Sequence, residues 1–177
     1  MSDEQAYLTI EPLPAQFDRI YSVRGRKSDT AYDVNPARLV CSCPDWTSQR
    51  SSLPPGDVRR VCEHLYDRLY ATKAERSFSP LQRLFIRYGR SMCTCRVVVN
   101  ERGVLVVGQP FSPGVVRGIG VIDGKSIVAT YDAHDREWSS LTDDLSDELS
   151  GWILDQMRAT LPEAFTLADQ RQRASRG

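Results

Sequence analysis

Four side chains of the sequence could bind one metal ion. Cys41 and Cys43 form a C-x-C pair, and Cys62 and His64 form a C-x-H pair after a gap of eighteen residues. Three thiolates and one imidazole make a complete tetrahedral ligand set for zinc, with Zn–S distances of about 2.3 Å and Zn–N distances of about 2.0–2.1 Å. The alternative is three buried cysteines without a chemical role beside a surface histidine. A disulfide explains the pairs less well, because a C-x-C disulfide closes a small strained ring. We therefore predict a zinc site.

The spacing within each pair indicates the element that carries it. In an extended strand, residues i and i+2 face the same side, so a strand over residues 37–41 lets Cys41 and Cys43 reach one ion. Pro44 ends that strand, because proline cannot donate to a ladder. Cys62 and His64 come just before Leu65 and Leu69, whose spacing indicates a helix that the second pair opens. The gap between the pairs is rich in Ser, Pro and Gly, which predicts a loop. The predicted site therefore joins a strand end to a helix start.

The same stretch resembles the SWIM zinc finger over residues 19–72. The ligand pattern C-x-C, gap, C-x-H agrees with that family, as do Tyr32 and Val34 on a preceding strand and residues 44–46, Pro-Asp-Trp, after the second cysteine. Val61 departs from the small residue or proline that is commoner there, without affecting the ligands. The resemblance implies a two-stranded hairpin followed by a helix, and binding to DNA or to another protein.

No sequence pattern indicates catalysis. A zinc ion with four protein ligands has no open position for water, and such sites are structural. Cys93 and Cys95 form a second C-x-C pair, for which His134, Asp132 and Asp135 are the available partners. We favour two structural cysteines on one face of a strand start over a second metal or redox site. Motifs for nucleotide binding, acyl transfer or zinc hydrolysis do not occur in the sequence. The sequence therefore predicts a protein that is not an enzyme.

Composition narrows the class of protein. Of the 177 residues, 41% are hydrophobic and 26% are charged, which is ordinary for a soluble globular chain. No run approaches the roughly 20 apolar residues that span a bilayer, and the acidic N-terminus lacks the apolar core of an export signal. Five cysteines, an odd number, argue against a secreted disulfide framework. We expect an intracellular protein (cytoplasmic, or nuclear in a eukaryote) with no membrane partner.

Charge is divided unequally along the chain, although the net charge is zero. Residues 18–90 contain 14 Arg and Lys against 8 Asp and Glu, a difference of +6, whereas residues 92–170 contain 6 against 12, a difference of −6. A basic surface attracts phosphates, so the first half would contact a nucleic acid. Chance or a need for solubility would also explain this asymmetry. The candidate contacts are Arg24, Arg26, Lys27, Arg59 and Arg60.

Two sets of arginines have a second interpretation. Arg59 and Arg60 could bind a phosphate at the following helix, or could only neutralise the zinc site, which carries a net charge of −1 with three thiolates. Arg83, Arg87 and Arg90 lie on one face of a predicted helix that Ser79 caps. That face is either a solvated side or a surface for phosphate or a partner.

The expected function is that of a non-enzymatic zinc-binding module that binds nucleic acid, with DNA as the first candidate. The alternative is a protein–protein adaptor or small subunit of a larger DNA-processing complex, whose acidic C-terminal part docks a partner.

The predicted fold class is α+β: a small zinc-stabilised hairpin-plus-helix finger followed by a four-stranded antiparallel sheet with a packed helix. Apolar runs on either side of a turn at 100–103 and of an Asp-Gly turn at 123–124 predict the two hairpins of that sheet, 96–99 with 104–107 and 118–122 with 126–131. Leu141, Leu145 and Leu149 begin the apolar face of the helix. The expected segments are a loose lead-in (1–17), the finger (18–75), a linking helix (76–92), the α+β domain (93–167) and a frayed tail (168–177).

Overall fold

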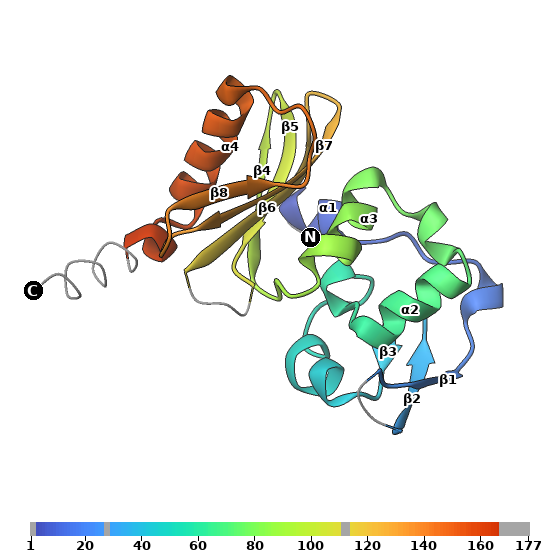
Figure 1. The fold of residues 1–177 in the computed structure, drawn as a ribbon. Helices are drawn as coiled ribbons and strands as arrows, with labels where there is room; N and C mark the ends of the chain where they lie inside the picture. Colours follow the sequence, from blue (N-terminus) through green and yellow to red (C-terminus); the bar gives the residue numbers. More distant parts are fainter. Residues whose placement is uncertain (1–2, 27–28, 111–113, 167–177) are drawn as a thin grey trace, which may run out of the picture. The chain divides into compact units, whose positions relative to one another are not determined.

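A computed structural model gives the structure of the chain and describes residues 3–26, 29–110 and 114–166. The chain divides into two compact units, Met1–Cys93 and Thr94–Gly177, here called the N-terminal and C-terminal units. Figure 1 shows a small sheet with several short helices in the first and a larger sheet with one long helix in the second. The predicted tail, 168–177, lies outside the described residues. None of the described helices is long and apolar enough to cross a membrane.

The N-terminal unit contains a three-stranded antiparallel sheet in the order β1-β2-β3. Val34 of β2 pairs with Cys41 of β3, so the sheet register sets where the first cysteine lies. The last strand is shorter than the predicted 37–41, because Leu39 has a positive φ of 49° that ends the extended backbone before Val40. The strands are β1 (Tyr21–Arg24), β2 (Ala31–Asn35) and β3 (Val40–Cys41).

Short helices complete the N-terminal unit. Cys62 is the N-cap residue of α2, as the sequence predicts, and the buried Leu65 and Leu69 anchor this helix in the core. The side chain of Ser79 accepts the Gln82 N–H, while the Gln82 side chain accepts the Ser79 N–H, which makes a capping box for α3. The helical elements are α1 (Asp3–Leu8), η1 (Ala15–Phe17), η2 (Trp46–Arg50), η3 (Val58–Arg60), α2 (Glu63–Ala71), η4 (Ala74–Ser77), α3 (Pro80–Leu84) and η5 (Phe85–Gly89).

Two segments that were expected to be loops contain helical structure. The stretch before residue 18, predicted as a loose lead-in, contains α1 and the buried apolar side chains of Leu8, Ile10 and Leu13. The gap between the two ligand pairs contains η2 and η3. Its Ser, Pro and Gly content predicted a loop, but Trp46 is buried and ties η2 to the core.

The C-terminal unit contains a five-stranded antiparallel sheet in the order β4-β5-β6-β7-β8, so the prediction of four strands was wrong. The missed strand, β8, is a short polar segment whose sequence, Glu-Trp-Ser-Ser, carries no run of β-branched residues. It pairs with β7 after a turn in which Arg136 has a φ of 56°. The strands are β4 (Cys95–Asn100), β5 (Gly103–Gly108), β6 (Val115–Ile122), β7 (Lys125–Asp132) and β8 (Glu137–Ser140). The first four confirm the two predicted hairpins.

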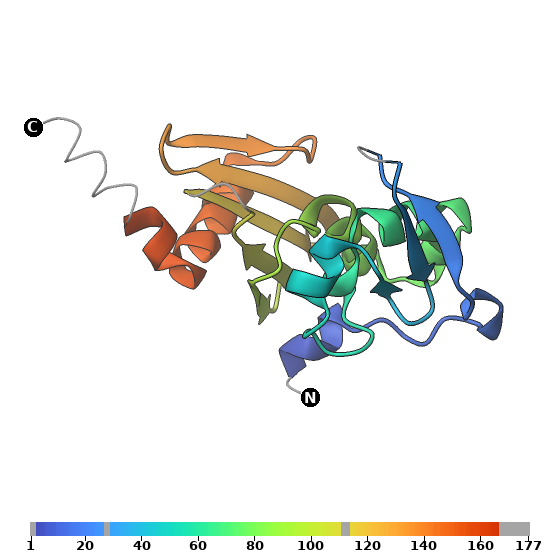
Figure 2. The same ribbon diagram turned by 90° about the horizontal axis from the view of Figure 1, so that it is seen from below.

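One helix, α4 (Asp147–Thr160), covers one face of this sheet (Figures 1 and 2). It begins later than the predicted Leu141, because Ser146 accepts the Leu149 N–H and caps it, and Leu141 is 69% exposed. The buried Ile153 and Met157 of α4 pack against sheet residues such as Leu105 and Ile127. The C-terminal unit therefore has a hydrophobic core of its own.

Candidate metal centre

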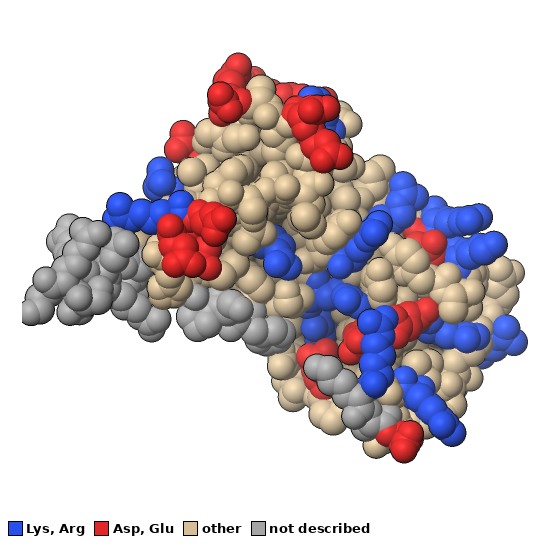
Figure 3. All heavy atoms as spheres, viewed as in Figure 1, with Lys and Arg blue, Asp and Glu red and all other residues tan. Residues whose placement is uncertain are grey.

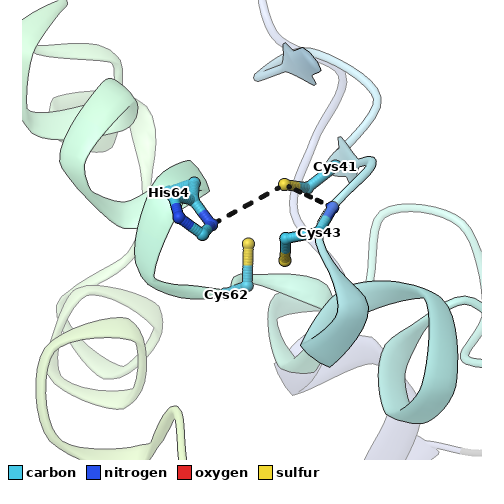
Figure 4. A group of neighbouring side chains, drawn as sticks. All are labelled: Cys41, Cys43, Cys62 and His64. Carbon is cyan, nitrogen blue, oxygen red and sulfur yellow. Dashed lines mark hydrogen bonds between the residues drawn. The ribbon is translucent and has the colours of Figure 1, made fainter. Parts of the chain in front are cut away.

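The structure brings Cys41, Cys43, Cys62 and His64 together. Their donor atoms, three sulfurs and one imidazole nitrogen, all lie within 4.8 Å of one another. Cys41 ends β3, Cys43 follows two residues later, Cys62 caps α2 and His64 lies in its first turn. Figure 4 shows the four side chains surrounding a common space between the strand end and the helix start. A single metal ion could therefore be held by all four.

The distances fit a tetrahedral site. Cys41 Sγ lies 3.9 Å from His64 Nδ1. With the usual zinc bond lengths, donor atoms at the corners of a tetrahedron are about 3.6–3.8 Å apart. The observed distance is close to that edge length, so Nδ1 is the imidazole atom placed to bind. The ring of Tyr32 packs against the His64 ring, with centroids 4.7 Å apart, and holds the imidazole in this orientation.

Burial makes this group of thiols unfavourable as anions unless a cation joins them. Cys41, Cys43 and Cys62 are 1–2% exposed. Burial raises the pKa of the Cys43 thiol above its ordinary value. The neighbouring Cys41 thiol and burial together raise the pKa of Cys62 well above its ordinary value. A divalent cation bound between the sulfurs would reverse this preference, because its charge stabilises the thiolates.

Backbone donors already point at two of the sulfurs. The Cys43 N–H lies 3.4 Å from Cys41 Sγ, and the Trp46 N–H lies 3.4 Å from Cys43 Sγ. Hydrogen bonds from backbone N–H groups favour the charged form of an acceptor. The turn after β3 thus supports thiolate ligands. The strand ends at Cys41, before the Pro44 that was predicted to end it.

An uncommon backbone conformation positions the first ligand pair. Leu39, two residues before Cys41, has a positive φ although it is not glycine, a state that needs support from its surroundings. Its carbonyl oxygen accepts the Trp46 indole N–H at 3.0 Å and the Arg60 Nε–H at 3.3 Å. The Arg60 guanidinium also packs over the Trp46 ring, 4.8 Å from its centroid. These contacts hold the chain as it enters β3.

Arg50 connects the two ligand pairs. Its side chain, 4% exposed, donates to the Asp45 carboxylate at 2.9 Å. It also donates to three backbone carbonyls, those of Arg59, Val61 and Arg90. Val61 directly precedes Cys62, and Asp45 follows Cys43 by two residues. Arg50 therefore holds the segment after the first pair against the segment before the second, and the charged pair is almost fully satisfied by hydrogen bonds.

The structure separates the five arginine and lysine candidates for nucleic-acid binding. Arg59 forms an ion pair with the buried Asp57 at 2.6 Å, and its side chain is 14% exposed. Arg60, which is buried, donates to backbone carbonyls, and burial lowers the pKa of its guanidinium. Both arginines thus act inside the fold. Arg24 is exposed on β1, and Arg26 is exposed but paired with Glu63 and Asp67 of α2. Lys27 lies outside the described residues.

Sequence reasoning missed the positioning roles of Trp46, Arg50 and Asp57. Asp57 is fully buried and accepts hydrogen bonds from the Arg59 backbone and side chain and from Gln5. An arginine or aspartate in a Ser- and Pro-rich stretch reads as a solvated loop residue, so no local signal could have identified these two. Trp46 had a weak signal: a large aromatic residue directly after a ligand pair in a polar segment.

The second C-x-C pair does not build a metal centre in the described part of the chain. There, Cys41, Cys43, Cys62 and His64 form the one group of three or more His, Cys, Asp or Glu side chains close enough to hold an ion. Within the described residues Cys93 and Cys95 form no disulfide; both are half-buried, and the Cys93 thiol donates to Gln49 Oε1 at 3.6 Å.

The fold and the donor set define the N-terminal unit as a small α+β domain with a Cys3His cluster compatible with a zinc finger. No protein-family model, curated protein or solved structure matches the chain.

Proposed function

We propose that the cluster binds Zn²⁺ and that the N-terminal unit is a SWIM-type zinc finger. Three thiolates and an imidazole in tetrahedral arrangement are the ligands that select zinc among the common divalent ions. All four positions belong to the protein, so the ion has a structural role and the module is non-enzymatic. Metal binding would supply folding free energy to a unit whose ligand segments are short and polar.

We propose that this module binds nucleic acid, with DNA as the first candidate. The observation that carries the proposal is the excess of basic side chains in the metal-centred unit: residues 18–90 hold 14 Arg and Lys against 8 Asp and Glu. Several of these cations are exposed, including Arg24, Lys73, Arg76, Arg83 and Arg87. Figure 3 shows Lys and Arg side chains spread over the surface of α2 and α3. Such a surface attracts a phosphate backbone.

Fluorescence anisotropy with labelled single-stranded and duplex DNA tests this function. We expect binding that weakens steeply as salt rises, because each phosphate contact releases counterions, with a log–log slope of about −0.7 to −0.9 per contact. The zinc-chelated protein is the matched control and should lose binding, since the module needs its ion to fold. No binding of the zinc-loaded protein to either DNA or RNA at low salt would refute the proposal.

One observation favours the second candidate, a protein–protein adaptor. A pocket of about 320 Å³ lies beside the metal centre and is lined in part by Ile20, Val40 and Cys41. Ile20 is 70% exposed and Val40 36%, so the pocket presents apolar side chains that a partner could cover. Comparing proteins retained by the natural chain and by Ile20→Asp tests this role. A partner lost only with Ile20→Asp supports the adaptor, and identical retention contradicts it.

A further inference from the structure

Tyrosines and arginines alternate on one surface of the N-terminal unit. Tyr66 and Tyr70 lie one turn apart on α2, with ring centroids 4.6 Å apart. The Arg90 guanidinium, just after η5, lies 4.0 Å from the Tyr66 centroid. Arg87, within η5, is exposed, and so is Tyr70, at 36%. We call these four residues, Tyr66, Tyr70, Arg87 and Arg90, the tyrosine–arginine face.

Positive charge predominates in the segment that follows α2, whereas Glu63 and Asp67 of α2 itself are paired with Arg26. Residues 73–90 contain five basic residues and a single acidic one, Glu75. Lys73, Arg76 and Arg83 are exposed there. Burial is the main cause that raises the pKa of Tyr70; Tyr66 and Glu75 add to the rise, whereas Arg87 opposes it. The exposed cation Arg87 therefore lies close enough to the Tyr70 hydroxyl to affect its pKa.

Internal packing explains only half of this face. The Arg90–Tyr66 contact joins η5 to α2, and the Arg90 carbonyl accepts a hydrogen bond from Arg50, so these groups stabilise the unit. Even so, Arg90 Nη1 is buried without a hydrogen-bond partner among the described residues. Tyr70 and Arg87 project an aromatic ring and a cation outward, which the core does not require. An exposed tyrosine beside exposed arginines, one of which also packs over the Tyr88 ring, suits a ligand with both flat rings and negative charges.

We propose that the tyrosine–arginine face binds single-stranded nucleic acid, with one base stacked on Tyr70 and adjacent phosphates contacted by Arg87 and Arg83. This inference deepens the proposed function and depends on it. Every base has a π-face, but a duplex hides these faces within its stack, so an aromatic platform selects single strands. Arginine supplies bidentate phosphate contacts and can itself stack on a base.

Three variants of the full-length, zinc-loaded protein test the inference, each titrated with fluorescein-labelled oligothymidine and with a duplex of the same length. Tyr70→Leu removes the platform and should weaken single-strand binding about 10-fold while leaving duplex binding unchanged. Tyr70→Phe keeps the ring and should bind as the natural chain does. Arg87→Gln should reduce the magnitude of the log–log salt slope by about 0.7 for the single strand. Zinc content and thermal midpoint show that each variant is folded.

Arg19→Gln is the matched control, because it removes the same charge from an exposed position just before β1 of the same unit and is not one of the candidate contacts. It should keep single-strand affinity within about 2-fold, since one distant charge contributes little at physiological salt. If Tyr70→Leu and Arg87→Gln bind normally while Arg19→Gln loses affinity, the inference is overturned and the proposed function stands. Binding to duplex alone also overturns it. If the natural chain binds neither DNA, the proposed function fails first. Should Tyr70→Leu not fold, the Arg87→Gln slope decides.

Discussion

At the scale of single residues, the account depends on three buried sulfurs and one imidazole that lie within 4.8 Å of each other. Without a cation the sulfurs of such a group remain neutral thiols, because thiolates in a buried position repel each other and lose their hydration. The residues that hold the group are themselves polar and buried: Arg50, Asp57 and Arg60 use their hydrogen-bonding groups inside the fold. Substituting a ligand, or one of the buried polar residues that hold the ligands, should therefore lower the free energy of unfolding.

Cys62→Ser should abolish stoichiometric zinc binding and unfold the N-terminal unit. The hydroxyl is a poor zinc ligand, and its loss removes a large share of the roughly 10–16 kcal/mol that structural zinc contributes to folding in zinc-finger peptides. Metal analysis and amide hydrogen exchange measure both effects. Cys93→Ser is the control, since Cys93 is half-buried and outside the cluster; it should retain zinc. Full zinc retention by Cys62→Ser would contradict the ligand assignment.

Arg50→Met should lower the free energy of unfolding of the N-terminal unit by about 3–5 kcal/mol, since it leaves the Asp45 charge and three carbonyls without their partner. Chemical denaturation of the zinc-loaded protein measures the change. Arg38→Met removes an exposed ion pair with Asp18 instead and should leave the free energy of unfolding almost unchanged, because solvent screens that pair. Equal effects of the two substitutions would show that Arg50 does not connect the ligand pairs.

At the scale of elements, the strands and helix caps with strong local signals could be predicted from the sequence. The Asp-Gly turn and the valine-rich runs predicted both hairpins, and Ser79-Pro80 predicted the start of α3. Elements determined by distant contacts could not be predicted. β8 is ordered by its pairing to β7, and the start of α4 is decided by Ser146 rather than by the apolar spacing from Leu141. Neither the pairing of β8 with β7 nor the choice of Ser146 as the cap is visible in the local sequence pattern.

Gly120 in β6 tests how closely the strands of the C-terminal sheet approach each other. A Cβ at this position would lie 2.4 Å from the Val104 carbonyl oxygen, so Gly120→Ala must displace backbone and should destabilise the unit by about 1–3 kcal/mol. Gly151→Ala, in α4, meets nothing within 4 Å and should stabilise it by about 0.5–1 kcal/mol. Thermal unfolding measures both. The same sign for the two substitutions would contradict the packing of this sheet.

At the scale of the whole molecule, the two units should respond differently to metal removal. Only the N-terminal unit contains the cluster, whereas the C-terminal unit has a hydrophobic core formed by α4 and its sheet. A chelator should therefore abolish hydrogen-exchange protection in α2 and β2 and leave it intact in β5 and β6. Loss of protection throughout the chain would show that the C-terminal unit depends on the metal too.

The sequence predicted the residues of the candidate metal site better than it predicted which arginines lie on the surface. Ligand spacing encodes the metal site directly, because two i, i+2 pairs at a strand end and a helix start can reach one ion. The fate of each arginine could not be predicted, because Arg24 and Arg60 look alike in sequence while one is exposed and the other buried. Only tertiary contacts distinguish a cation that binds a carbonyl from one that faces solvent.

X-ray absorption at the zinc edge, on protein dialysed free of loose metal, tests the central claim most directly. The account predicts one zinc ion per chain with about three sulfur neighbours at about 2.3 Å and one nitrogen neighbour at about 2.0–2.1 Å. A chain that retains no zinc, or a zinc ion surrounded only by oxygen and nitrogen, would contradict it.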